Sequence, residues 1–236
     1  MLDSYQHPEF YLEPRNQFNM QTVSASKSLA EQAYIQVEEL IVTLALAPGH
    51  VFSEGELSQQ INIGRTPLRE ALQRLAANRL VKVLPRKGMM VTEINFADQL
   101  AMLETRRVLD QLIASRAARR ASNAQRDQLA TLGTQIIQAA NSSDINAFMR
   151  LDRTCDEVLE EASKNPYAAQ ALSSLHTHCR RFWYQYQMED DLKHSAQLHA
   201  AMIKAVISKN EDQAAEASDA IIDYLEFFIK EAHDLA

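Results

Sequence analysis

The chain has 236 residues, 46% of them hydrophobic, which is enough to bury the core of one or two domains. Its five glycines and six prolines are few, which favours helix and argues against a β-rich fold. A net charge of −7 excludes a uniformly basic protein, and no apolar run approaches the roughly 20 residues that cross a bilayer.

The two cysteines, Cys155 and Cys179, are too few for a disulfide framework. We expect two buried thiols in a reducing compartment. The N-terminus contains acids and aromatics and does not resemble a signal peptide. A cytoplasmic protein with no membrane association is therefore expected.

Residues 1–27 are polar, lack a hydrophobic period and contain Pro8 and Pro14, so we expect a mobile arm or a loosely docked extension. A first helix is predicted over 28–47, where apolar residues recur at helical spacing. Pro48–Gly49 would end this helix.

The next segment predicts two short helices joined by a tight turn. Ser53 and Glu56 fit a capping box, in which a hydroxyl caps the helix start and the acid reaches back. The pattern breaks at Gly64. Thr66 and Pro67 then open a second helix, where the missing N–H of proline costs nothing.

The outer face of this second helix carries cations. Its leucines recur at helical spacing and face inward, so Arg65, Arg69 and Gln73 point outward. A helix start with free N–H groups and two arginines suits a phosphate backbone and a guanine edge.

A small hairpin follows the second helix. Residues 80–83 and 89–91 read as strands around a turn at 85–88. Arg86 and Lys87 lie in the turn, where they can contact phosphate or enter a minor groove. Helix, turn, helix and hairpin together predict a winged helix-turn-helix. The predicted DNA contacts are Arg65, Thr66, Pro67, Arg69, Gln73, Arg86, Lys87 and Gly88.

Charge is unevenly distributed along the chain. Residues 51–93 contain seven Lys and Arg against four Asp and Glu, a balance of +3, so the remainder must carry −10. A small basic domain joined to a larger acidic one reconciles DNA binding with the negative total.

The rest of the chain predicts only helices. We place a winged helix-turn-helix over 28–93 and an all-helical bundle of about six helices over 96–236, which makes the fold mainly α. The expected helices are 96–121, 124–140, 144–163, 166–188, 190–208 and 210–234.

Several charged residues lie within apolar stripes of these helices. Arg106 and Asp110 lie on one stripe, and a buried guanidinium needs a carboxylate from a side chain or from a ligand. Asp152 and Asp156 lie on another, so either one is protonated or a cation lies between them. His199 lies on a third and can be a metal ligand or a hydrogen-bonded core histidine.

The run LHTHCRRFWYQYQ has two polar helical faces. His178 and Arg181 share one, and His176 and Arg180 share the other. One face can line a pocket while the other meets solvent or a neighbouring subunit. Arg181 together with Arg106 can clamp an organic acid, because guanidinium matches carboxylate geometry.

Two stretches resemble a known family. The run GRTPLREALQRLAANRLVKVLPRKGMMV resembles the DNA-binding domain of the GntR family of bacterial transcriptional regulators, with Gly64 where that family usually has serine. The runs LETRRVLDQLIASRAA, LDRTCDEVL and SAQLHAAMIKAVISKNEDQAA are similar to the FCD domain, the effector-binding half of the FadR-type branch. The resemblance covers most of residues 30–230.

The resemblance also implies a metal site, since many FCD domains bind a metal through one Asp and three His. Asp152 takes the Asp position and His199 one His position, while Asp156 and Ile221 stand where the family has His. A divalent ion held by Asp152, Asp156 and His199 is therefore an open expectation. This oxygen-rich set would favour manganese or magnesium over zinc.

These features predict a homodimeric transcriptional regulator, a repressor that binds a palindromic operator and is released by a small carboxylate metabolite. The expected effector contacts are Arg106, Asp152, His178, Arg181 and His199. No nucleophile-elbow, zinc-protease, P-loop or dinucleotide motif occurs, so we do not expect an enzyme. The alternatives are a constitutive DNA-binding protein with a purely dimerising helical half, a metal-dependent helical enzyme, and a winged helix used for protein contacts.

Overall fold

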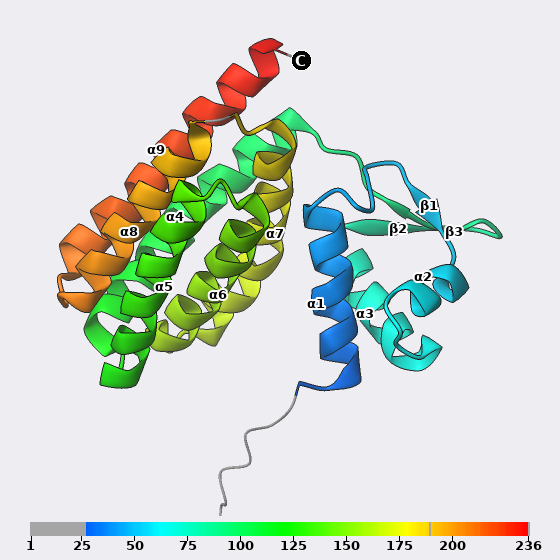
Figure 1. The fold of residues 1–236 in the computed structure, drawn as a ribbon, viewed down its shortest axis with the longest axis horizontal. Helices are drawn as coiled ribbons and strands as arrows, with labels where there is room; N and C mark the ends of the chain where they lie inside the picture. Colours follow the sequence, from blue (N-terminus) through cyan, green and yellow to red (C-terminus); the bar gives the residue numbers. More distant parts are fainter. Residues whose placement is uncertain (1–26, 189, 236) are drawn as a thin grey trace, which may run out of the picture.

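The computed structural model describes residues 27–188 and 190–235 (Figure 1). The expected N-terminal arm, apart from Lys27, lies outside this range. The elements in chain order are α1 (Leu29–Val42), β1 (Val51–Phe52), α2 (Glu54–Gln60), α3 (Arg65–Ala77), β2 (Val81–Leu84), β3 (Gly88–Val91), α4 (Phe96–Arg120), α5 (Asn123–Asn141), α6 (Ile145–Ser163), α7 (Pro166–Tyr186), α8 (Asp191–Ile207) and α9 (Glu211–Leu235).

The elements α1 to β3 form one unit, here called the N-terminal domain, and α4 to α9 form the helical domain. Each has its own hydrophobic core. The predicted fold class is confirmed, since a winged helix-turn-helix precedes an all-helical bundle. In Figure 1, α1 lies between the rest of the N-terminal domain and the bundle helices α6 and α7.

Local sequence explains the helix-turn-helix. Ser53 and Glu56 form the predicted capping box: the Ser53 N–H donates to Glu56 Oε2 at 3.0 Å, and the Glu56 N–H donates to Ser53 Oγ at 3.2 Å. In α3, Leu68, Leu72 and Leu75 are almost completely buried. Their burial fixes which side of α3 faces outward.

The first helix is shorter than predicted, because it ends at Val42 rather than near residue 47. Leu44 adopts a positive φ of 60° and turns the chain. The Leu46 N–H then donates to the Leu40 carbonyl at 2.8 Å, and the Leu46 side chain is buried. The apolar residues after Val42 therefore pack against the core from a turn.

The sheet contains a strand that the sequence pattern did not predict. The strand order is β1-β3-β2, and both pairs are antiparallel. In the short β1, Val51 pairs with Met90 and Phe52 with Met89. The hairpin β2–β3 agrees with the prediction and pairs Val81 with Val91.

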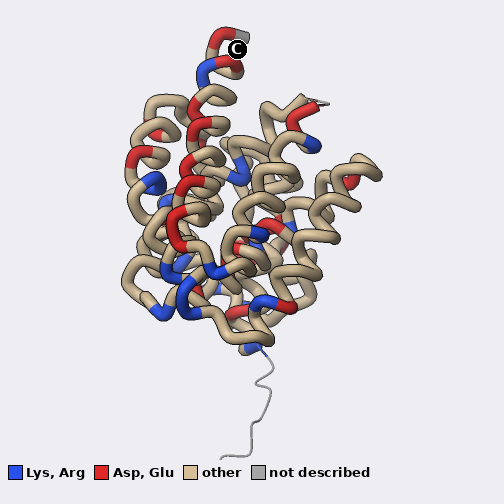
Figure 2. Tube along the Cα trace, turned by 90° about the vertical axis from the view of Figure 1, so that its left-hand side faces the viewer, with Lys and Arg blue, Asp and Glu red and all other residues tan. Residues whose placement is uncertain are grey.

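The bundle explains the acidic total of the chain. Asp and Glu recur along α9, the helix that ends at the C-terminal label in Figure 2. Arg107 of α4 bonds three of these acids, with Asp223 at 2.8 Å, Glu226 at 3.0 Å and Asp219 also in contact. Both cysteines are free and buried, as predicted. Within the described residues, no helix is long and apolar enough to cross a membrane.

Candidate nucleic-acid interface and bundle cavity

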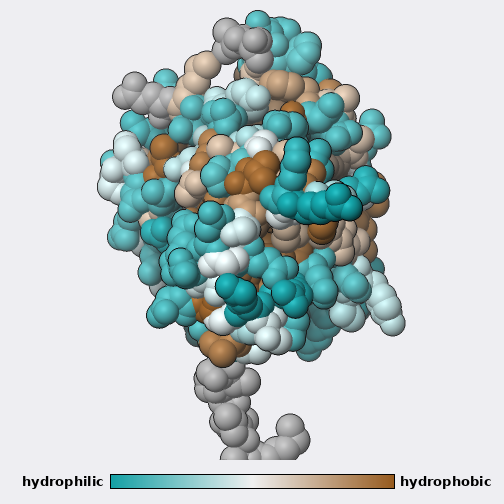
Figure 3. Space-filling view, turned by 90° about the vertical axis from the view of Figure 1, so that its right-hand side faces the viewer, coloured by the Kyte–Doolittle hydropathy of each residue, from teal (hydrophilic) through white to brown (hydrophobic). Residues whose placement is uncertain are grey.

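The outer face of α3 and the hairpin β2–β3 flank one groove. The groove has a volume of about 410 Å³, and Arg69 and Gln73 line it from α3. Arg86 and Gly88 line it from the hairpin. Figure 3 looks onto this end of the molecule, where hydrophilic side chains cover most of the surface. Six of the side chains predicted to contact DNA are exposed: Arg65, Thr66, Arg69, Gln73, Arg86 and Lys87.

Arg69 is held in place by an acid of α2. Its Nη2 lies 2.7 Å from Glu54 Oε2, and its Nε lies 3.1 Å from the same oxygen. The Arg69 side chain is still 61% exposed. The hydrogen bonds from Arg69 hold the pKa of Glu54 below its ordinary value. Glu54 therefore orients an accessible guanidinium without burying it.

The N-terminus of α3 is open to an anion. Its N-cap, Gly64, is exposed and makes no side-chain capping bond. The first N–H groups of a helix attract phosphate when no side chain satisfies them. Pro67 is half-buried in this first turn and shapes it.

Gly88 has a conformational role in the hairpin. Its φ is +99°, and a Cβ at this position would clash with the carbonyl oxygen of Phe52 in β1. Arg86 at the hairpin tip also has a positive φ of 64°. Gly88 therefore allows the turn that presents Arg86 and Lys87 beside the groove.

In the bundle, the predicted stripe residues meet in a buried charge cluster. Arg106 Nε lies 3.0 Å from Asp110 Oδ2, as a side-chain pair one helical turn apart. His176 Nε2 lies 2.8 Å from Asp110 Oδ1, and His176 Nδ1 lies 3.1 Å from Asp156 Oδ2. Burial opposes the charged form of His176, but the carboxylates of Asp156 and Asp110 outweigh it and raise the pKa of His176 well above its ordinary value.

The same cluster includes Asp152, one turn before Asp156 on α6. Arg180 Nη1 lies 2.7 Å from Asp156 Oδ2 and 3.4 Å from Asp152 Oδ2. His199 Nε2 lies 2.8 Å from Asp152 Oδ1, while its Nδ1 contacts the Ser195 carbonyl at 2.7 Å. The cation expected between the two aspartates is thus the guanidinium of Arg180.

The space beside the cluster is small. It consists of two hollows, of about 40 Å³ and 30 Å³. Spaces of this size hold water molecules but no metabolite. Both hollows are lined by Arg106, Asp156, His176, His199 and Ile221.

This arrangement does not fit a divalent metal ion. Arg180 takes the place between Asp152 and Asp156, and the apolar Ile221 faces the same hollows. Among residues 27–188 and 190–235, no three His, Cys, Asp or Glu side chains are grouped so that they can hold a metal. A metal bound by Asp152, Asp156 and His199 stays an untested prediction that these donors do not favour.

The polar face of α7 that carries His178 and Arg181 was expected to line an effector pocket. It lies against the N-terminal domain instead. Arg181 is 1% exposed and donates from Nη2 to the Thr92 carbonyl at 2.6 Å. His178 Nε2 donates to the Asn78 carbonyl at 2.9 Å. Both therefore face the N-terminal domain, and Arg181 does not form a clamp with Arg106. On the other face of α7, His176 lines both hollows and Arg180 lines the larger one.

Comparison with known proteins agrees with this architecture. Residues 29–91 match the family described as bacterial regulatory proteins, gntR family, and residues 101–224 match the FCD domain. The chain is 28% identical over 153 residues to the HTH-type transcriptional repressor RspR of Escherichia coli (strain K12), a match covering 65% of this chain and 67% of that protein. It is 27% identical over 179 residues to the Nta operon transcriptional regulator of Aminobacter aminovorans, covering 75% and 82%.

A solved structure has the same fold. E. coli McbR/YncC superposes with a TM-score of 0.77 at 18% identity, covering 88% of this chain and 100% of that one. The FCD match alone spans more than half of the sequence. The chain therefore belongs to the GntR family of bacterial transcriptional regulators and carries an FCD domain behind its winged helix-turn-helix.

Proposed function

We propose that this regulator is a repressor that binds a palindromic DNA operator as a homodimer, and that a small carboxylate metabolite bound by its helical domain changes its DNA affinity. The observation that carries the proposal is the exposed cationic set on α3 and the hairpin, arranged around one groove. A helix in the major groove with a wing beside it reads base edges and phosphates together.

The dimer follows from the way such domains read DNA. One α3 offers a short contact surface, while two related by a two-fold axis read half-sites about one helical turn apart. The family membership supports this arrangement. The operator is then expected to be a short palindrome.

The helical domain supports a response to a ligand. It carries guanidinium groups, which match the geometry of a carboxylate, and the contacts of α7 with the N-terminal domain would provide a route to the DNA contacts. A ligand switches the protein only if it binds the DNA-competent and DNA-free arrangements with different affinity.

The relatives named above are transcriptional regulators, which supports a regulator over a metal-dependent enzyme. The second candidate function is a constitutive DNA-binding protein whose helical half only dimerises. The well-paired charge cluster in the bundle favours this alternative, because such a cluster stabilises helices without any ligand. A ligand-dependent change in operator affinity separates the two.

DNA binding can be tested with the full chain. Operators are selected from random duplexes, and affinities are then measured by fluorescence anisotropy over a salt series. We expect Arg65→Ala or Arg69→Ala to abolish operator binding without altering the circular dichroism spectrum. At low salt, where weak residual binding can be measured, each lost phosphate contact should lower the salt slope by about 1.

Arg116→Ala provides the control, since Arg116 lies on α4 and pairs with Glu211 at 3.7 Å, away from α3. This variant should bind like the wild type. Normal operator binding by both the Arg65 and Arg69 variants would show that α3 is not the recognition helix. Selected sites without two-fold symmetry would count against the dimer.

A further inference from the structure

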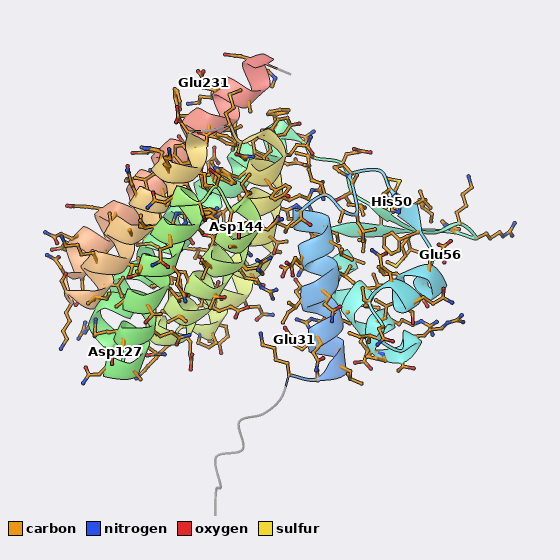
Figure 4. All side chains as sticks on the ribbon, viewed as in Figure 1. Glu31, His50, Glu56, Asp127, Asp144 and Glu231 are labelled. Atoms are coloured by element: carbon orange, nitrogen blue, oxygen red, sulfur yellow. The ribbon has the colours of Figure 1, made fainter. Side chains whose placement is uncertain are left out.

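Another space, larger than the two bundle hollows, lies between the two domains. It has a volume of about 190 Å³ and is bounded by α1 on one side and by α6 and α7 on the other. Figure 4 shows side chains from α1 and α6 projecting toward each other across this space. We call it the interdomain cleft. Unlike the hollows of the bundle, it is large enough for a small organic molecule.

The two walls of the interdomain cleft carry opposite net charges, although Lys27 lies on the acidic side and Glu157 on the basic side. Glu38 and Glu39 line it from α1, while Arg150 and Arg153 line it from α6. Arg150 Nη1 lies 3.2 Å from Glu39 Oε1, and Arg153 Nη1 lies 3.0 Å from Glu38 Oε2. The cleft is thus bridged by ion pairs that join the N-terminal domain to the helical domain.

The inner ion pair is imperfect. Glu38 is 4% exposed, yet its Oε2 makes no hydrogen bond, because the 3.0 Å approach of Arg153 is poorly aligned. Arg153 also lies 3.2 Å from Glu157 on its own helix. A buried carboxylate oxygen without a hydrogen bond is costly. A better aligned carboxylate would therefore compete well for Arg153.

The remaining surface of the cleft indicates what kind of molecule fits. Ile35, Val42 and Met149 provide apolar surface. Arg180 lies at the inner end, where it borders both the cleft and the larger bundle hollow. A cationic wall, an apolar floor and a third guanidinium suit a small carboxylate with a hydrocarbon body.

We infer that the interdomain cleft is a binding site for a small carboxylate with an apolar body, which pairs with Arg150 and Arg153 in place of Glu39 and Glu38. The inference deepens the proposed function and rests on it for its regulatory meaning. The ligand replaces the ion pairs that join the domains. Glu38 and Glu39 then lose their partners, and the N-terminal domain is freed to change its position.

The test uses the two halves of one ion pair in the full-length protein. Benzoate and hexanoate are titrated by calorimetry at millimolar concentration, with benzamide and hexanamide as uncharged probes of similar shape. Arg150→Gln should weaken binding of the carboxylates by about twofold to fivefold, the scale of an exposed ion pair. Glu39→Gln should strengthen it by a similar factor, because it removes the competing acid.

Arg153→Gln should weaken carboxylate binding by about tenfold, since Arg153 is the less exposed of the two arginines. Arg116→Gln is the matched control: it breaks an Arg–Glu pair elsewhere in the helical domain and should leave binding unchanged. The amide probes should not bind measurably.

The inference requires that Arg150→Gln and Glu39→Gln change the carboxylate affinity in opposite directions. If the ion pair only holds the domains in shape, Arg150→Gln and Glu39→Gln will shift carboxylate binding in the same direction, which overturns the inference. If wild type and both variants bind the carboxylates with equal affinity, the probe binds outside the interdomain cleft, and the inference is also overturned. So does the absence of saturable binding of both carboxylates to wild type and Glu39→Gln.

Operator affinity is measured separately with the same proteins. Carboxylate binding that follows the expected pattern but leaves operator affinity unchanged would refute the ligand response and keep the site. Normal operator binding without any carboxylate site would refute the site and keep the DNA-binding function.

Discussion

Arg180 supplies the positive charge that a metal ion would otherwise provide between two aspartates. Asp152 and Asp156 lie one turn apart on α6 and are both largely buried. Two such carboxylates repel each other unless a positive charge lies between them. Burial opposes the charged form of Arg180, but Asp156 and Asp152 outweigh it and raise its pKa above the ordinary value. The guanidinium therefore stays charged and supplies that positive charge.

Removing Arg180 should expose this role. Arg180→Ala leaves two buried carboxylates without their shared cation and should lower the free energy of unfolding by about 3–5 kcal/mol. Manganese should restore part of the lost stability in this variant, because the truncation leaves space between Asp152, Asp156 and His199. Urea denaturation with and without manganese measures both effects.

Arg180→Lys serves as the control, since it keeps a positive charge and should lose less stability than the alanine variant. Wild-type protein should be unaffected by manganese or by EDTA. A wild type that manganese stabilises and EDTA destabilises would mean that the bundle holds a metal despite Arg180.

The comparison of Arg180 with Arg181 also shows where the sequence stops being informative. Both are arginines on polar faces of α7, and one residue turns a helix by about 100°. Which face lies against the bundle depends on the packing of distant helices, which no local pattern encodes. By contrast, Arg65, Arg69 and Gln73 were correctly placed on an exposed face, because the buried leucines of the same helix fix their direction.

At the level of elements, the wing depends on a strand that local patterns do not reveal. β1 has two residues, and it exists only because Phe52 and Val51 pair with β3, about 40 residues further along the chain. The helices of the bundle were predictable because each spans several turns with a repeated apolar stripe and clear break residues. The pairing of β1 with β3 brings the backbone of Phe52 close to Gly88.

This close approach makes Gly88 hard to replace. Gly88→Ala would place a methyl group against the Phe52 carbonyl at a φ of +99°. We expect the variant to lose about 1–3 kcal/mol of stability and to bind the operator more weakly, because the hairpin must move. Thermal unfolding and DNA anisotropy test the two effects.

Gly133→Ala is the control for this substitution. Gly133 lies inside α5, where an added Cβ would meet Ile203 Cγ2 at 3.4 Å, an ordinary contact, and alanine favours helix. Its stability should be unchanged or slightly higher. A Gly88→Ala protein as stable as wild type would mean that β1 is not fixed against the hairpin.

At the level of the whole molecule, α7 connects the two domains. One of its faces carries His176 and Arg180 toward the charge cluster, and the other carries Thr177, His178 and Arg181 toward the N-terminal domain. The hydroxyl of Thr177 donates to Glu38 of α1. The contact between the domains thus combines buried polar groups with apolar packing, since Val42 of α1 belongs to the hydrophobic core of the bundle.

The burial of Arg181 at this interface costs free energy. Its Nε is buried without a hydrogen-bond partner. Burial lowers the pKa of Arg181 to about 10, although the nearby charge of Glu93 opposes the shift. Its hydrogen bonds go to the hydroxyl and the carbonyl of Thr92. A substitution that relieves this burial is therefore expected to change the stability of the contact between the domains.

His178 makes the stability of the folded protein sensitive to pH. Burial lowers its pKa below the ordinary 6.5, and Arg181 and Arg79 add to the effect, while its hydrogen bond to Asn78 and the charge of Asp98 oppose it. In the unfolded chain the ring takes up a proton near 6.5, whereas in the folded protein it does so at lower pH. The folded state therefore binds fewer protons, and the stability present above 6.5 is lost as pH falls toward the folded pKa.

His178→Gln tests this prediction, because glutamine can still donate to the Asn78 carbonyl but does not titrate. Urea unfolding of both proteins from about pH 7.5 down to about pH 5.5 should show wild type losing stability relative to the variant as pH falls through the histidine range. The other titrating groups, including His176 and His199, are common to both proteins and cancel in the difference. A difference that stays constant with pH, or that grows in favour of the wild type on acidification, would mean that His178 is not held neutral between the domains.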